Sequence, residues 1–150
     1  MSGTPKQRSG SCLCGKVRYS ISDKHGPDMT QLMCHCPNCL KSLGNSGAFT
    51  FCPRDNFTFT EGSKDQVKIY HDQATDSKDE MQRQFCTNCG SCVLITTDHN
   101  TSVAIVPVGT MDCGGQGWWK PEIECQCNNK KDWMAEYAGT QMHDRNPTFG

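Results

Sequence analysis

The sequence predicts a mainly β fold in a single domain over residues 1–150. A chain of this length is long enough to bury one sizeable core. Residues 16–21, "KVRYSI", place Val17, Tyr19 and Ile21 on one face and polar side chains on the other. This period of two is typical of a half-buried strand, and the segments between such stretches are short and rich in turn-forming residues.

Four more stretches show a similar pattern and are predicted strands: 57–60, 66–71, 92–97 and 102–108. Turn-forming residues separate them at 53–56, 61–63 and 98–100. Residues 72–84 are polar without a clear period, which indicates a long connection. Residues 129–138, "NKKDWMAEYA", predict one short C-terminal helix. We expect an ordered core over about residues 10–138, flanked by polar ends.

The charge of the chain excludes several classes of partner. Fifteen Lys and Arg residues are balanced by 16 Asp and Glu residues, so no basic field exists to bind nucleic acid or an anionic membrane. Neither of the glycine-rich nucleotide-binding motifs, G-x-G-x-x-G and G-x-x-x-x-G-K-[ST], is found. The polar opening "MSGTPKQRSG" lacks the apolar run of a signal peptide, and no segment is as apolar as a membrane span. We therefore expect a cytoplasmic protein with reduced thiols.

Twelve cysteines in a reduced protein of this size indicate metal binding. Residues 12–15, "CLCG", and 86–90, "CTNCG", each hold two cysteines followed by glycine. In a zinc knuckle the residue after the second cysteine often needs a positive φ, which glycine adopts without steric cost. The predicted ligands of a structural Cys₄ zinc site are Cys12, Cys14, Cys86 and Cys89. The alternatives are ordinary buried cysteines or disulfides.

A third cluster, "MCHCPNCLK" at residues 33–41, contains Cys34, Cys36 and Cys39 but no closing glycine. Three thiolates fill three corners of a tetrahedron, and an open fourth corner is what distinguishes catalytic zinc from structural zinc. His35 could fill the open corner, but because it lies between two of these cysteines we expect it to point away from the metal as a packing or solvent-facing residue. The sequence therefore predicts a catalytic zinc site here.

The charge of such a site limits its chemistry. Zn²⁺ with three thiolates carries a formal charge of minus one, which makes it thiophilic and a weak Lewis acid towards water. It suits the making or breaking of carbon–sulfur bonds better than peptide hydrolysis. The candidates for proton transfer are His35, His71 and Asp112, and Arg83 is a candidate for holding an anionic group of the substrate.

The other five cysteines give weaker signals. Cys52, Cys92 and Cys113 stand alone near strand ends, where a cysteine is usually a small hydrophobic residue. Cys125 and Cys127 form a C-x-C pair without a glycine, and we expect an exposed pair, with binding of either cysteine to the second zinc as the alternative.

Several motifs together resemble one known family. They are "GSCLCGKVRYSI", "CHCPNC" followed by "GAF", "RQFCTNCGS" and "VPVGTMD". In this combination and order the chain resembles the glutathione-dependent formaldehyde-activating enzymes, a family that also contains centromere protein V. The similarity covers residues 10–112, with a further match at 121–133.

The resemblance implies a compact zinc-bridged β fold related to methionine sulfoxide reductase B. It implies two zinc ions per chain, a structural ion on the two knuckles and a catalytic ion on the triple cluster. The implied activity is that of a carbon–sulfur lyase acting on a small-molecule thiol adduct, such as S-hydroxymethylglutathione or a thiol conjugate of a larger metabolite, with glutathione as a possible co-substrate. One alternative is a non-catalytic interaction module like centromere protein V. Another is a sulfoxide reductase that uses Cys113. The oligomeric state stays open.

Overall fold

The computed structural model describes residues 7–24, 29–112, 114 and 116–147. Within these residues the chain forms one α-helix, α1 (Pro37–Leu43), and two β-sheets. The strands are β1 (Arg8–Ser11), β2 (Arg18–Ile21), β3 (Thr30–Cys34), β4 (Gly47–Pro53), β5 (Phe57–Phe59), β6 (Val67–Asp72), β7 (Met81–Cys86), β8 (Cys92–Thr97), β9 (Val103–Pro107), β10 (Ile123–Cys125) and β11 (Gln141–Met142). Short 3-10 turns cover Arg54–Asn56, Lys64–Gln66, Val108–Thr110 and Cys127–Asn129. The predicted mainly β class is confirmed.

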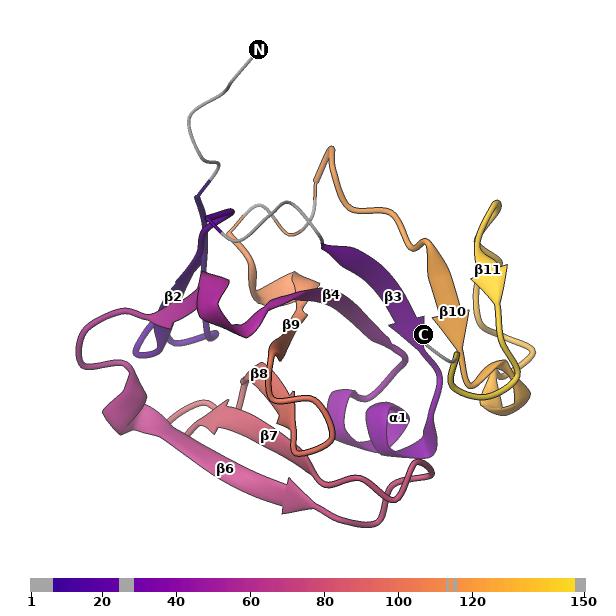
Figure 1. The fold of residues 1–150 in the computed structure, drawn as a ribbon, viewed down its shortest axis with the longest axis horizontal. Helices are drawn as coiled ribbons and strands as arrows, with labels where there is room; N and C mark the ends of the chain where they lie inside the picture. Colours follow the sequence, from indigo (N-terminus) through magenta and orange to yellow (C-terminus); the bar gives the residue numbers. More distant parts are fainter. Residues whose placement is uncertain (1–6, 25–28, 113, 115, 148–150) are drawn as a thin grey trace.

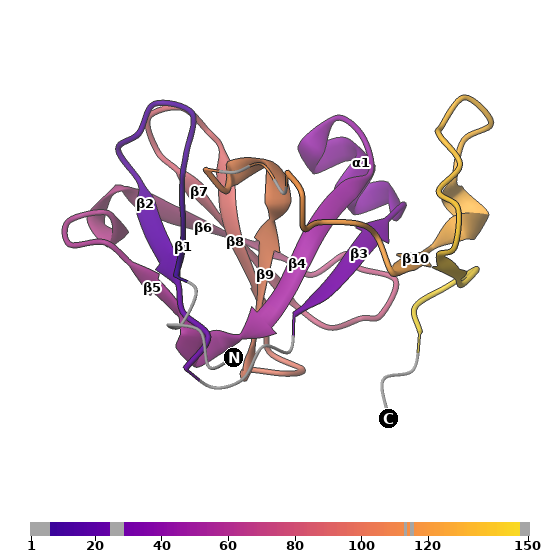
Figure 2. The ribbon, with the colours of Figure 1, turned by 90° about the horizontal axis from the view of Figure 1, so that it is seen from above.

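The small sheet is antiparallel with the order β1-β2-β5, and the large sheet has the order β11-β10-β3-β4-β9-β8-β7-β6. Strand β10 pairs in parallel with both β3 and β11, whereas the other pairs of the large sheet are antiparallel. The large sheet is strongly curved, so that β6 and β7 face β3 and β4, with α1 near one end (Figure 1). Seen from above, the small sheet and β10 stand at opposite ends of the molecule (Figure 2).

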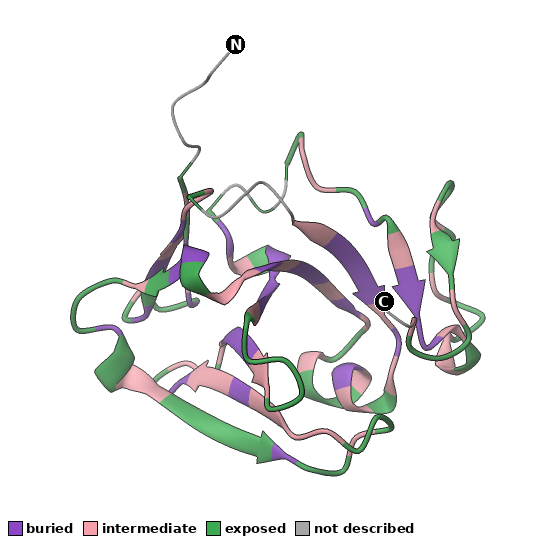
Figure 3. Ribbon diagram, viewed as in Figure 1, coloured by how far each residue is buried: buried purple, intermediate pink, exposed green. Residues whose placement is uncertain are grey.

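The central strands are apolar on both faces because both faces are covered. On β8, Val93, Leu94 and Ile95 are all at most 1% exposed. Leu94 packs in a core beneath the small sheet, together with residues such as Tyr19, whereas Ile95 belongs to a second core on the opposite face. Burying side chains of this size contributes about 1.5–3 kcal/mol each. Edge strand β6 is mostly exposed, in contrast to β3 and β10 (Figure 3).

The five predicted strands are confirmed as β2, β5, β6, β8 and β9, with ends shifted by at most two residues. The predicted connection over 72–84 is wrong at both ends, because β6 continues to Asp72 and β7 begins at Met81. Gln82 and Gln84 form hydrogen bonds with the hydroxyl of Thr96 on β8. β7 itself carries three polar residues in succession, Gln82, Arg83 and Gln84, so it shows no apolar period in the sequence.

The predicted helix at 129–138 is also wrong, because these residues form turns. A short helix gains most of its stability from an apolar face packed on the protein, but Trp133 is 68% exposed. The α-helix lies instead at Pro37–Leu43, inside the triple-cysteine motif. Among the described residues, no helix is long and apolar enough to cross a membrane.

Candidate metal centres

Two turns that are distant in sequence bring four cysteines together. The members of this four-cysteine cluster are Cys12, Cys14, Cys86 and Cys89, whose sulfur atoms all lie within 4.8 Å of one another. The Sγ of Cys14 lies 3.6 Å from that of Cys12 and 3.7 Å from that of Cys86. Tetrahedral zinc with Zn–S bonds of about 2.3 Å separates its sulfurs by about 3.8 Å. The cluster therefore has the donor type and the size of a tetrahedral zinc site.

A glycine closes each turn with the predicted backbone conformation. Gly15 has φ +78° and Gly90 has φ +77°. Their N–H groups donate to the carbonyls of Cys12, at 3.1 Å, and of Cys86, at 2.8 Å. The N–H of Asn88 points at the sulfur of Cys86, at 3.4 Å. These are the backbone contacts expected of a zinc knuckle.

Neighbouring donors favour thiolates in this cluster. Hydrogen bonds from the hydroxyl and backbone of Ser91 lower the pKa of Cys89 to about 5. A hydrogen bond from the side chain of Asn88 lowers the pKa of Cys14. Burial raises the pKa of Cys86. Because metal ligands must lose their protons, the first two thiols are already poised to bind an ion.

The triple-cysteine cluster lies where β3 meets α1. Cys34 ends β3, and Cys36 caps the helix, because its sulfur accepts a hydrogen bond from the N–H of Cys39 at 3.2 Å. Pro37 fits the first helical position because its missing N–H would have no partner there. The three sulfurs lie within 4.8 Å of one another. The tight turn thus presents three sulfurs to one point.

The structure places a fourth cysteine beside this cluster, where sequence reasoning expected none. Cys125 is 4% exposed and lies directly opposite Cys34 in the parallel pairing of β10 with β3. Hydrogen bonds from Cys125, Cys36 and Cys39 lower the pKa of Cys34. The predicted exposed pair is therefore wrong for Cys125, while Cys127 is half-buried. The sulfur of Cys125 lies outside the group of three that are all within 4.8 Å.

His35 points away from the cysteines, as predicted, into a buried polar network. Its Nδ1 contacts the hydroxyl of Ser46 at 2.6 Å, and its Nε2 contacts Glu124 at 2.9 Å. Glu124 is fully buried and also accepts a hydrogen bond from Lys130 at 3.1 Å. His35, Glu124 and Cys127 are close enough to hold a metal ion. However, the ammonium of Lys130 already supplies the cation that the carboxylate needs, so this group is an ion-paired support for the turn that carries Cys34 and Cys36.

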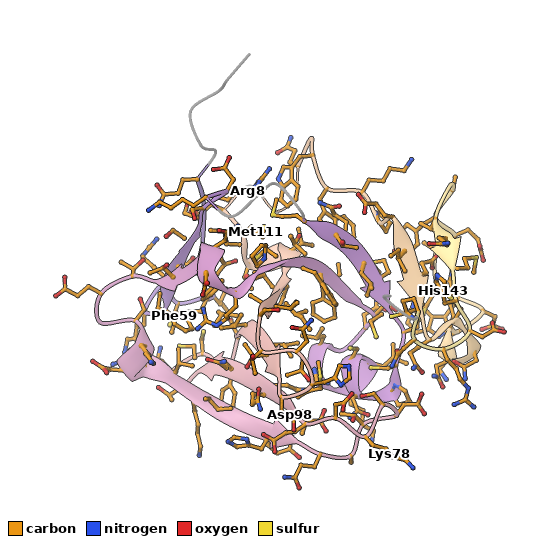
Figure 4. The ribbon with its side chains drawn as sticks, viewed as in Figure 1. Arg8, Phe59, Lys78, Asp98, Met111 and His143 are labelled. Atoms are coloured by element: carbon orange, nitrogen blue, oxygen red, sulfur yellow. The ribbon has the colours of Figure 1, made fainter. Side chains whose placement is uncertain are left out.

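The triple-cysteine cluster opens into a cavity of about 920 Å³ on the face of the large sheet away from the small sheet. Cys34, Cys36, Cys39 and Cys125 all line it. Loops 73–80 and 98–102 border its mouth, and the N–H of Asp98 donates to the carbonyl of Glu80 at 3.4 Å. Figure 4 shows Lys78 and Asp98 on these two loops, in the lower half of the view. A small molecule in this cavity would reach the cysteines.

Arg83 lines the same cavity but already has a partner. Its Nε donates to Asp72 at 2.9 Å, and its side chain is 9% exposed. Burial alone raises the pKa of Asp72, but hydrogen bonds from Asn38 and Arg83 outweigh it and lower that pKa overall. The predicted role of Arg83 as an anion-binding residue is weakened by this pairing.

The remaining candidates lie elsewhere. His71 pairs with Glu80 on the exposed strand β6, and Asp112 accepts a hydrogen bond from Ser9; neither lines the cavity. Burial raises the pKa values of Cys52 and Cys92 to about 11, which fits their predicted role as small apolar residues. Cys113 lies outside the described residues, so the sulfoxide reductase alternative stays untested.

The cysteine–glycine spacing in the sequence indicated the four-cysteine cluster clearly. The position of Cys125 beside the triple-cysteine cluster and the network around Glu124 were not predicted. Strand β10 has only three residues, and its pairing with β3 joins segments about 90 residues apart. A short strand with a single apolar position outside its cysteine gives no period to find. Only the register of β10 against β3 reveals that these side chains meet.

The fold and the two clusters define a cysteine-rich β-sheet protein with sites that could hold metal ions. The model of the glutathione-dependent formaldehyde-activating enzyme family matches residues 7–129, and the chain belongs to this family. A Halomonas elongata protein provisionally named a glutathione-dependent formaldehyde-activating enzyme is 27% identical over 86 residues, which are 57% of this chain and 54% of that protein. The match thus spans about half the length of this relative.

A protein of known crystal structure from Rhodobacter sphaeroides has a similar fold. It aligns with a TM-score of 0.50 and 20% identity over 69% of this chain and 87% of its own. At this identity the likeness concerns the fold alone. The relation to methionine sulfoxide reductase B stays a prediction.

Proposed function

We propose that this protein is a zinc-dependent carbon–sulfur lyase that acts on a thiol adduct of an aldehyde. The observation that carries the proposal is the position of Cys34, Cys36 and Cys39 at one end of a cavity large enough for a small molecule. Membership of a family named for glutathione-linked formaldehyde activation supports a reaction of this kind. S-hydroxymethylglutathione is one adduct of the required class.

The reaction needs no oxidant or reductant. The carbon–sulfur bond of the adduct breaks, and its electron pair stays on sulfur. The hydroxyl on the same carbon becomes the carbonyl of the released aldehyde, and the proton of that hydroxyl is transferred to the sulfur or to solvent. The reverse reaction joins a thiol to an aldehyde.

The residues of the chain divide the work between two proposed zinc ions. Cys34, Cys36 and Cys39 would hold the catalytic ion, which when bound stabilises a thiolate. The mainly apolar walls of the cavity would surround the reacting sulfur. The four-cysteine cluster would hold the structural ion and so join the turn between β1 and β2 to the turn between β7 and β8. The cavity favours this activity over the non-catalytic interaction module.

Native mass spectrometry of the metal-replete protein tests the proposal. We expect two zinc ions in the wild type, one in Cys36→Ser, and two in the control Cys92→Ser, whose half-buried thiol lies in neither cluster. Cleavage of a thiol adduct should be lost in Cys36→Ser and kept in Cys92→Ser. If the folded Cys36→Ser variant keeps full activity, the lyase mechanism is wrong. A single zinc ion that this substitution does not remove would favour the interaction module.

A further inference from the structure

The walls of the cavity are mainly apolar. Its floor is the second core of the large sheet, and side chains from five strands face it. They are Leu32 of β3, Phe49 and Phe51 of β4, Met81 of β7, Ile95 of β8 and Ile105 of β9. Phe51 and Met81 are only partly buried, so their surface is available to a ligand. An apolar molecule that covers them would remove apolar surface from water.

The charged groups around the cavity do not favour an anion. Arg83 is the only lysine or arginine among the described residues that line it, and Asp72 binds its guanidinium at 2.9 Å. Asp76 and Asp79 bring carboxylates to the mouth, where Asp76 lies 3.6 Å from the exposed guanidinium of Arg145 and Asp79 lies 3.6 Å from the exposed ring of His99. These two pairs are exposed and therefore weak, whereas the buried pair of Arg83 with Asp72 would have to be broken before Arg83 could bind a ligand carboxylate.

The triple-cysteine cluster also favours a neutral ligand over an anion. Loaded with Zn²⁺, its three thiolates leave a formal charge of minus one at the end of the cavity. Glutathione carries two carboxylates and one ammonium group, so it is itself a net anion at neutral pH. Bound with its sulfur at the cysteines, it would bring like charge towards the cluster, where Arg83, the only lysine or arginine among the described lining residues, is already held by Asp72.

We infer that the cavity takes the adduct of a neutral, apolar organic thiol rather than that of glutathione. This inference rests on the proposed lyase function and names its substrate class. The cavity, at about 920 Å³, falls at the upper end of the range of about 300–1,000 Å³ that is usual for sites binding drug-sized ligands. It therefore accommodates an aromatic or branched aliphatic group on the sulfur.

Binding of two free thiols to the zinc-loaded protein tests the inference without measuring turnover. Benzyl mercaptan is a neutral apolar probe, and glutathione is the charged one. We expect benzyl mercaptan to bind about 100-fold more tightly, which is the gain from burying roughly one aromatic ring. Native mass spectrometry counts the bound thiol and the retained zinc together, and the rise in thermal midpoint gives an independent measure of affinity.

A matched pair of variants places the binding in the cavity. Phe51→Lys removes an apolar side chain from the wall and adds a cation, so it should weaken benzyl mercaptan binding. The ratio of the benzyl mercaptan affinity to the glutathione affinity should fall by about tenfold. Ile69→Lys is the control, because Ile69 is 42% exposed on β6 and does not line the cavity. It should leave both affinities unchanged.

The outcomes separate the two proposals. Glutathione binding as tightly as benzyl mercaptan, together with cleavage of its formaldehyde adduct, would overturn the apolar substrate class and leave the lyase function standing. If neither thiol binds the zinc-loaded protein and no adduct is cleaved, both proposals fail. A loss of benzyl mercaptan binding in Ile69→Lys equal to that in Phe51→Lys would place the binding outside this cavity and overturn the inference.

Discussion

Glu124 offers a sharp test of how the triple-cysteine turn is supported. Its carboxylate is fully buried and accepts hydrogen bonds from Lys130 at 3.1 Å and Thr140 at 2.6 Å, and it also contacts His35 at 2.9 Å. In Glu124→Gln the shape is kept, but the ammonium of Lys130, whose side chain is only 9% exposed, loses its buried anion. Breaking a buried ion pair on one side costs about 3–5 kcal/mol.

Urea unfolding of the metal-replete protein measures this cost. The control is Glu136→Gln, since Glu136 lies 3.8 Å from the same ammonium of Lys130 but is 86% exposed. Exposed pairs contribute at most about 1 kcal/mol, so the control should change stability by about 0.5 kcal/mol or less. In thermal unfolding, Glu124→Gln should lower the midpoint by about 10 °C. Equal effects of the two substitutions would refute the reasoning.

The same variant should also weaken metal retention at the triple-cysteine cluster. Glu124 holds the ring of His35, and His35 lies between Cys34 and Cys36 in the chain. When this support is lost, the turn should present its sulfurs less accurately, and outer contacts of this kind are worth about 10–100-fold in metal affinity. Competition with a chelator measures the change. Unchanged retention would mean that the network supports the fold alone.

Three further predictions concern single residues. Gly90→Ala should lower the free energy of unfolding by about 1–2 kcal/mol. The whole cost comes from the positive φ, because a Cβ at this position meets no atom within 4 Å. Gly109 is equally open but has no positive φ, so Gly109→Ala should leave stability unchanged, and similar unfolding midpoints of the two variants would contradict this. Cys125→Ser should keep the two proposed zinc ions by native mass spectrometry, because its sulfur lies outside the group of three, and loss of one ion would make Cys125 a ligand. The pKa of Asp72 is lowered in the folded state, so its pairing with Arg83 stabilises the protein above the unfolded pKa of about 4. This stabilisation is lost as the pH falls through the folded pKa, so the difference in unfolding free energy between wild type and Asp72→Asn should shrink over that interval in acid titrations. A constant difference would refute the pairing.

Strands with a one-sided or continuous apolar pattern were predictable from the sequence. β2 buries Tyr19 and Ile21 beneath the small sheet, and β8 is a continuous apolar run. The cysteine–glycine knuckles were equally clear, because Gly15 and Gly90 mark the positive φ that each turn requires. These signals are local, so the residues that determine them lie within a few positions of one another.

The missed elements depend on partners that are distant in sequence. β7 has polar residues in its middle and is ordered through its pairing with β6 and β8, and the three residues of β10 are ordered through their pairing with β3. The residues that the prediction of a C-terminal helix covered form turns instead, and among them Lys130 is held by the buried carboxylate of Glu124. Such contacts exist only once the sheet has formed, so no local sequence pattern predicts them.

Strand β7 of the large sheet links the four-cysteine cluster to the cavity at the triple-cysteine cluster. Cys86 ends β7, and the same strand supplies Met81 and Arg83 to the cavity. An ion in the four-cysteine cluster would therefore fix the end of a strand that forms a wall of the proposed active site. Loss of that ion should change the cavity as well as the stability of the fold. Benzyl mercaptan binding should consequently weaken in Cys89→Ser even where the triple-cysteine cluster keeps its zinc, and full binding by that folded variant would show that the two sites are independent.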